Sequence, residues 1–156
     1  LVTGRALGGE SGRGMVNVND YMITVDNPAN NKFIKIWNDR WKQGYDKPYG
    51  RPTYMYPATI FGMTSESTYW LLDVVARAGS TNAEKIIKVW EGDKWVGLSG
   101  LMEMRACDHQ VIRDVFVTEF IFPNKWFTDA ASYGEPVVMP REIAVSPVPK
   151  DLKRCN

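Results

Sequence analysis

The sequence predicts an α/β fold that is incomplete as it stands. The expected elements follow the order strand, helix, helix, helix, strand, strand, which is typical of the α/β class. That class has parallel sheets flanked by helices, and this chain holds too few strands for a complete parallel sheet. The opening stretch LVTGRALGGESGRG has no initiating Met and begins inside a pattern. We therefore expect the natural start, with any export signal, to lie far upstream.

The first part of the chain predicts a strand followed by a helix. Residues 15–18 alternate between apolar and polar side chains, which indicates a short strand, and residues 21–25 continue extended. Asp26, Asn27 and Pro28 then indicate a helix start, because a capping side chain precedes a proline in the first turn. Gly44 is expected to end the helix. Within it apolar residues recur at helical spacing: Phe33, Ile34, Trp37 and Trp41.

The middle of the chain predicts two more helices. Residues 45–58 form a loop rich in Pro, Gly and Tyr, after which a helix is expected over 64–78, with Gly79 as its stop. Thr81 and Glu84 form a capping box that opens the third helix. Strands are expected over 101–105 and 111–122, and residues 124–156 read as an irregular tail that wraps the surface.

Composition excludes several classes of partner. The 156 residues are 44% apolar and 24% charged with a net charge of +1, so nothing favours nucleic acid or an anionic membrane. No apolar run approaches the ~20 residues of a membrane helix. The glycine-rich start lacks the spacing of a phosphate-binding loop. Six Trp and seven Tyr indicate either a Trp-rich core or an aromatic ligand cleft, and composition does not choose between them.

The two cysteines, Cys107 and Cys155, suit a disulfide in an oxidising compartment that ties the tail to the body of the fold. Spacing alone leaves two unrelated free thiols as the alternative. A single His beside two cysteines does not make a zinc site, so we expect no metal and no cofactor.

Four stretches resemble the branched-chain amino acid (leucine/isoleucine/valine-type) solute-binding proteins of ABC transporters, which have the type I periplasmic binding fold. Their order and spacing over roughly residues 14–122 carry the resemblance, rather than any one motif. The stretches are DNPANNKF (26–33), LLDVVARAGS (71–80), AEKIIKVWEG (83–92) with VGLSG (96–100), and RACDHQ (105–110).

The resemblance implies two lobes joined by three crossing segments, of which this chain is the C-terminal portion. Residues 1–18 would hold the end of one lobe and the second crossing, and 19–103 the helices and strands of the N-terminal-type lobe. Residues 104–110 would form the third crossing, a hinge, and 111–156 would belong to the C-terminal-type lobe. Such a piece leaves sheet edges open, so we expect it together with the N-terminal portion.

The implied function is the substrate-binding component of an ABC importer in the periplasm, or outside the cell on a lipid anchor. Its partners would be a small amphiphilic solute, such as an amino acid, an aromatic acid or an amide, and a membrane permease. The resemblance implies no catalysis. Two alternatives remain: a hydrolase-type enzyme that uses Asp108 and His109, and the ligand-sensing domain of a receptor.

Candidate ligand contacts lie before the second helix and around the second crossing. In the family, the segment before that helix offers an aromatic ring to the ligand, although each ring here is equally compatible with packing under the loop. Glu10 could pair a ligand ammonium or remain a solvated carboxylate. The candidates are Tyr54, Tyr56, Phe61, Met63, Tyr21 and Glu10.

Candidate hinge residues are polar groups at the two crossings, where side chains can bond backbone that leaves regular structure. His109 with Asp108 also suggests a general base and its partner, but no nucleophile is evident in the sequence. We therefore favour the hinge role for these residues: Asn17, Arg105, Asp108, His109 and Gln110.

Overall fold

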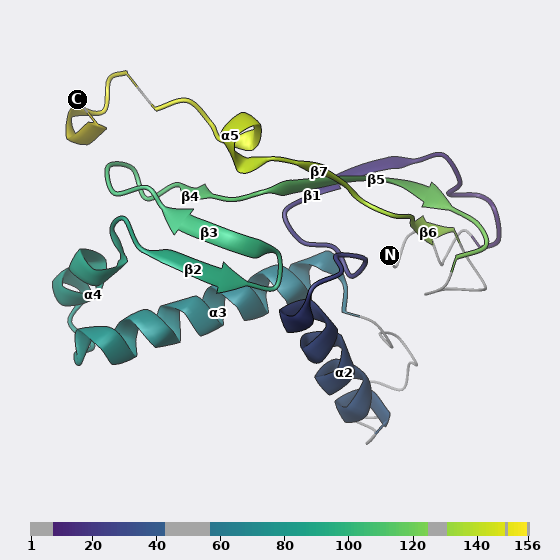
Figure 1. The fold of residues 1–156 in the computed structure, drawn as a ribbon, viewed down its shortest axis with the longest axis horizontal. Helices are drawn as coiled ribbons and strands as arrows, with labels where there is room; N and C mark the ends of the chain where they lie inside the picture. Colours follow the sequence, from purple (N-terminus) through teal and green to yellow (C-terminus); the bar gives the residue numbers. More distant parts are fainter. Residues whose placement is uncertain (1–7, 43–56, 125–130, 149, 156) are drawn as a thin grey trace.

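The computed structural model describes residues 8–42, 57–124, 131–148 and 150–155 (Figure 1). It contains helices and strands in the mixture that the sequence predicts. The helices are α2 (Pro28–Lys42), α3 (Thr59–Ala78), α4 (Ala83–Trp90), α5 (Arg141–Ala144) and a 3-10 turn (Lys153–Cys155). The strands are β1 (Val16–Asn19), β2 (Lys94–Gly97), β3 (Gly100–Met104), β4 (Val111–Ile112), β5 (Val115–Ile121), β6 (Ser132–Tyr133) and β7 (Val137–Met139).

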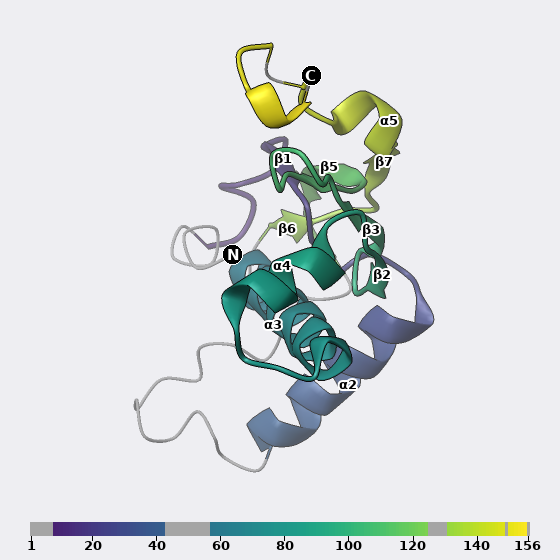
Figure 2. The ribbon, with the colours of Figure 1, turned by 90° about the vertical axis from the view of Figure 1, so that its left-hand side faces the viewer.

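The strands form two sheets, one with β5 between β1 and the pair β6 and β7, the other in the order β2-β3-β4. Every pairing among the described strands is antiparallel, in contrast to the expected parallel sheets. A parallel pair needs a crossover between its strands, usually a helix. Among the described residues α2, α3 and α4 follow one another with no strand between them, and none of the described strand pairs is joined by a helical crossover. They lie on one side of the sheets, with α5 and the C-terminal segment on the other (Figure 2).

Helix α2 begins where the sequence predicts. The side-chain oxygen of Asn27 accepts a hydrogen bond from the backbone N–H of Asn30 at 2.8 Å, and Pro28 is the first helical residue. Asn27 also donates to the carbonyl of Leu98 at 2.8 Å, which ties the helix start to the β2–β3 turn. The predicted end at Gly44 lies outside the described residues.

Helices α3 and α4 differ from the prediction at their starts. Helix α3 begins at Thr59 rather than near residue 64, and its preceding residue Ala58 has no side chain that could cap it. The predicted stop is correct, since Gly79 has a left-handed φ of 58°. The predicted capping box at α4 is wrong: Asn82 is the capping residue, and its side chain accepts from the N–H of Lys85 at 3.2 Å.

The expectation of an irregular tail over 124–156 is also wrong. Strands β6 and β7 both pair with β5, and α5 and the 3-10 turn follow. The sequence concealed them because strands of two and three residues are too short to show periodicity. The expected strand over 111–122 is divided into β4 and β5. Strand β2, four residues long, was also too short to be predicted.

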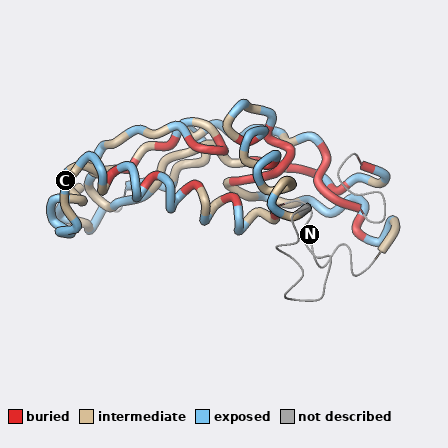
Figure 3. Tube along the Cα trace, turned by 90° about the horizontal axis from the view of Figure 1, so that it is seen from below, coloured by how far each residue is buried: buried red, intermediate tan, exposed pale blue. Residues whose placement is uncertain are grey.

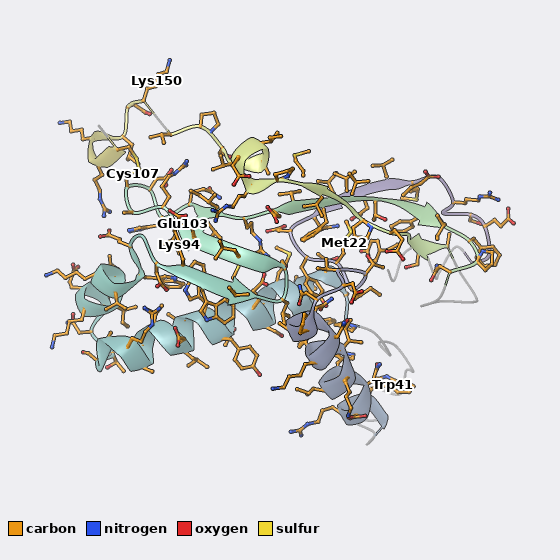
Figure 4. The ribbon with its side chains drawn as sticks, viewed as in Figure 1. Met22, Trp41, Lys94, Glu103, Cys107 and Lys150 are labelled. Atoms are coloured by element: carbon orange, nitrogen blue, oxygen red, sulfur yellow. A yellow bond between two sulfur atoms is a disulfide. The ribbon has the colours of Figure 1, made fainter. Side chains whose placement is uncertain are left out.

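Two apolar clusters form the interior, where the buried stretches gather between helices and sheets (Figure 3). The larger is built on residues 21–25, which are buried but form no strand; Met22, labelled in Figure 4, is one of its fully buried members. The smaller packs Trp70 and Val74 of α3 against Met102 and Met104 of β3. None of the helices in the described ranges is long and apolar enough to cross a membrane.

One face of the β1-β5-β7 sheet carries a row of valines, beside the exposed Glu119 that lies opposite Val16. Val18 lies opposite Val117, and Val117 lies opposite Val137, so three valines form a straight row across three strands. Val18 is 56% exposed and Val137 is 70% exposed. Val16 and Met139 extend this valine face. Contiguous apolar surface of this kind is unusual on a folded soluble protein unless another element covers it.

Candidate functional site

A cleft of about 360 Å3 lies where three segments meet: the residue after β1, the first half of α3, and the stretch from Gln110 to β5. The C-terminal segment after α5 closes one side. Its lining is half apolar and half polar, which suits a small amphiphile rather than an extended polymer. The lining residues are Asp20, Met63, Ser67, Gln110, Val111, Arg113, Val115, Ala144, Val145 and Ser146.

A buried ion pair stands at the wall of this cleft. Glu66 in α3 is fully buried and binds the guanidinium Nη2 of Arg113. Its carboxylate also accepts from the backbone N–H of Ser99 at 2.8 Å and from the Ser99 hydroxyl at 3.3 Å. A buried carboxylate needs partners of this kind, because an uncompensated charge in the interior is very unfavourable.

Close packing holds Glu66 in this position. A Cβ atom added at Gly97 would come 2.6 Å from the Oε2 atom of Glu66, so only glycine allows the β2 strand to approach. On the same helix, Gly62 lies directly against the ring of Tyr21, where an added Cβ would come within 2.2 Å. Glycine thus allows close packing on both sides of α3: Gly62 of the helix lies against Tyr21, and Gly97 of β2 lies against Glu66.

Tyr21, a candidate ligand contact, is a core residue. It is fully buried, and its hydroxyl donates to the side-chain oxygen of Asn30 at 2.9 Å. Burial, and next the negative charge of Glu66, raise the pKa of Tyr21 well above its usual value. The neutral phenol is thus a fixed hydrogen-bond donor inside the fold.

The other candidate ligand contacts have separate positions. Met63 lines the cleft, whereas Phe61 packs against Trp37 with ring centroids 5.2 Å apart. Glu10 is exposed and lies 3.8 Å from Arg13. Tyr54 and Tyr56 lie outside the described residues. Of the candidates in the described ranges, the structure therefore brings Met63 to the cleft.

The candidate hinge residues from Arg105 to Gln110 form one tight turn. Arg105 donates to both carboxylate oxygens of Asp108, at 2.8 and 2.6 Å, and Gln110 donates its backbone N–H to Asp108 at 3.1 Å. The Arg105 bonds above all hold the pKa of Asp108 down at about 2. His109 adopts a φ of 58°, which the turn requires. Asn17, the remaining candidate, lies in β1 and bonds the side chain of Asn19.

The geometry separates the pair that an enzyme alternative would need. Asp108 is engaged by Arg105, whereas the Nε2 atom of His109 lies 2.9 Å from Glu91. The hydrogen bond from His109, with a second from Arg154, lowers the pKa of Glu91. Arg154 belongs to the C-terminal 3-10 turn, so this cluster fastens the tail rather than assembling a base and a nucleophile.

A disulfide joins Cys107 to Cys155, as predicted, with an S–S distance of 2.07 Å and a Cα–Cα distance of 4.8 Å. It links the turn to the end of the tail, close to the position of Cys107 in Figure 4. Among the described residues, one group of side chains has metal-like spacing: Cys107, Asp108 and Cys155. Because the sulfurs are bonded to each other, they offer no thiolate to a metal.

Glu66 and Arg113 were not anticipated as site residues. A signal for Glu66 does exist, because it occupies the same helical stripe as Trp70 and Val74, both of which are buried. A carboxylate on an apolar stripe predicts a buried partner. The identity of that partner, 47 residues further along, has no local signature.

Comparison with protein families gives one match. Residues 3–124 match the model of a family described as periplasmic binding protein. Among curated proteins, none matches the sequence.

Solved structures give several matches to the fold. A leucine-binding protein from Thermotoga maritima MSB8 shares 22% identity with a TM-score of 0.60, over 86% of this chain and 33% of that one. An ABC-type branched-chain amino acid transporter protein from Rhodopseudomonas palustris CGA009 shares 23% identity with a TM-score of 0.58, over 83% and 32%. A solute-binding protein from Rhodopseudomonas palustris BisB5, in complex with 3,4-dihydroxybenzoic acid, shares 12% with a TM-score of 0.61, over 85% and 32%. The chain thus spans about a third of the length of these structures.

Proposed function

The chain belongs to the periplasmic binding protein family, and from this premise we propose that it is the C-terminal portion of a two-lobed receptor. The receptor captures a small amphiphilic solute and delivers it to the permease of an ABC importer. The observation that carries this proposal is the cleft at the meeting point of β1, α3 and β5, because it lies beside both segments assigned to interlobe crossings.

Capture depends on closure of the lobes. In this proposal residues 1–18 and 104–110 contain crossings, residues 19–103 belong to one lobe, and 111–156 belong to the other. A solute favours the closed state only through contacts that are better there than in the open state. The N-terminal portion of the receptor supplies the opposing surfaces, and the solute leaves unchanged, without catalysis.

The lining of the cleft indicates the chemistry of the solute. Met63, Val111 and Val115 offer apolar surface, while Ser67 and Gln110 offer hydrogen-bonding groups. A branched-chain amino acid or an aromatic acid combines both characters, and the names of related structures include ligands or transporters of both kinds. We assign the receptor to the periplasm, or to the outer surface of a membrane through a lipid anchor, and the disulfide supports an oxidising compartment.

The test is a titration of the complete receptor followed by its tryptophan fluorescence. We expect saturation with leucine, isoleucine, valine, 4-hydroxybenzoate or 3,4-dihydroxybenzoate. Met63→Ala should raise the Kd by roughly 5- to 30-fold, because it removes about 1–2 kcal/mol of apolar contact. Met15→Ala, at an exposed position that does not line the cleft, is the matched control and should leave the Kd unchanged.

Two outcomes would contradict the proposal. A flat response to all five solutes would remove the assigned solute class. Saturation with equal Kd values for Met63→Ala and the wild type would place the solute somewhere other than this cleft.

A further inference from the structure

Arg113 occupies an unusual position between the parts of the molecule that the proposed function requires to move. It lies between β4 and β5, directly after the proposed third crossing. Its side chain is 10% exposed, and its Nη2 atom donates to the backbone carbonyl of Asp20 at 2.7 Å as well as to Glu66. One guanidinium thus joins α3, the chain that leaves β1, and the start of β5.

The partners of Arg113 are themselves fixed. Glu66 is held by the two donors of Ser99, in the turn between β2 and β3, and the absence of a side chain at Gly97 lets that turn approach. Asp20 is followed by Tyr21, which is buried against Gly62 of α3. Arg113 therefore connects two anchored sites and does not end in a free side chain.

An ion pair in such a place is poorly explained by stability alone. Burying two charges carries a desolvation penalty, and apolar residues of similar volume often stabilise a fold as well or better. What an arginine adds is direction, since its rigid, planar guanidinium brings one nitrogen, Nη2, to both acceptors in one geometry. Arg113 therefore fixes the position of α3 relative to the chain after β1 and the start of β5.

We propose that Arg113 is a positioning residue for solute binding. It holds the α3 wall of the cleft, which includes Met63 and Ser67, at a fixed place relative to the chain that follows each of the two segments assigned to crossings. The wall then keeps its place relative to the ends of the crossings, where the lobes turn against each other. This inference rests on the proposed function, because it assigns a role within the same receptor.

The consequence is a preorganised cleft. With Arg113 in place, the wall that meets the solute is already set relative to the hinge, and less ordering opposes binding. Without it, Met63 and Ser67 remain but lose their fixed relation to the crossings. The loss should be seen in the distribution of lobe positions before any solute is added.

The first experiment is therefore free of solute. Spin labels at Lys88→Cys on α4 and Glu119→Cys on β5, both exposed positions, report the distance between the two proposed lobes in the complete receptor. We expect a narrow distribution in the otherwise unchanged protein. Arg113→Met should broaden it and shift it to another mean, and Arg113→Lys should do so less, because an ammonium keeps the charge but lacks the rigid plane of the guanidinium.

The matched control is Arg77→Met, on α3, the helix that carries Glu66. Arg77 pairs with Asp73 and Asp93, and it touches neither of the proposed crossings. Arg77→Met should leave the distribution unchanged even if the melting temperature falls. An unchanged distribution in a folded Arg113→Met receptor would overturn the proposal. Failure of both Arg113→Met and Arg113→Lys to fold would do so too, since the residue would then be structural.

A second measurement links the residue to solute. For whichever of the five solutes saturates the unaltered receptor, Arg113→Lys should raise the Kd by roughly 5- to 50-fold, the usual range of coupling between sites. An unchanged Kd would contradict the positioning role. If no solute binds the unaltered receptor, the proposed function fails, while the spin-label distances still decide whether Arg113 joins the segments.

Discussion

Two polar clusters hold distant parts of this chain together, and they do so by different means. Glu66 and Arg113 are 47 residues apart, and their ion pair itself makes the long-range link between α3 and the start of β5. Arg105 and Asp108 are three residues apart and close a single turn. At that turn the strongest long-range link is covalent, through Cys107 and Cys155, 48 residues apart, and Arg105 adds a hydrogen bond to the carbonyl of Ser146 at 2.9 Å.

The difference teaches where each cluster is vulnerable. The buried pair depends on both charges, because removal of one leaves the other without compensation in the interior. The turn tolerates loss of its ion pair better, since the disulfide still holds the tail against it. A series of substitutions should therefore rank the two clusters in a definite order.

The largest effect is expected from Glu66→Ala. The substitution removes the ion-pair partner of Arg113 and the acceptor of the Ser99 N–H in the interior. We expect a loss of about 3–5 kcal/mol in the free energy of unfolding. Urea denaturation measures the change. Glu84→Ala, an exposed residue in the first turn of α4, is the control. A loss below about 1 kcal/mol for Glu66→Ala, as at a surface pair, would erase the contrast between the clusters.

The next effect is expected from the double substitution Cys107→Ser and Cys155→Ser. Closure of a loop of this length stabilises the folded state by roughly 2–4 kcal/mol, through restriction of the unfolded chain. Urea denaturation of the variant and of the oxidised protein gives the difference. Intact mass with and without reductant checks that the link is present. Free thiols in freshly isolated protein would contradict the disulfide between Cys107 and Cys155.

The smallest effect is a pH dependence carried by Asp108. Its pKa is about 2 in the folded state against an ordinary value of 3.8, so its contribution to stability is present above pH 3.8 and is lost as the pH falls toward 2. The stability difference between wild type and Asp108→Asn should therefore be constant at neutral pH and shrink over that interval. A difference that stays constant down to pH 2 would show that the Arg105 pair does not lower this pKa.

The features that the sequence predicted correctly are local ones. The cap at Asn27 and the stop at Gly79 are local features, and each was predicted from neighbouring residues. The disulfide was predictable because the chain holds only two cysteines. Local chemistry sufficed wherever the partners lie within a few residues or have no competitor.

The remainder depends on tertiary contacts. Asn82 caps α4 instead of Thr81, one residue away, although the sequence favoured the capping box formed with Glu84. Strands β6 and β7 exist through pairing with β5 rather than through their own periodicity. The pair of Glu66 and Arg113 is the extreme case, since many cations lie at comparable separations and packing alone selects one.

The valine face has a practical consequence for anyone who handles this segment by itself. The sheet exposes an apolar row made of Val18, Val117 and Val137. Its edge strands also have backbone N–H and C=O groups that can pair with another strand. Association of two copies would bury the apolar row and pair the edge strands, so purification at high concentration favours aggregation. A row of this kind is an expected site of self-association, so dilute samples are the safer material for study.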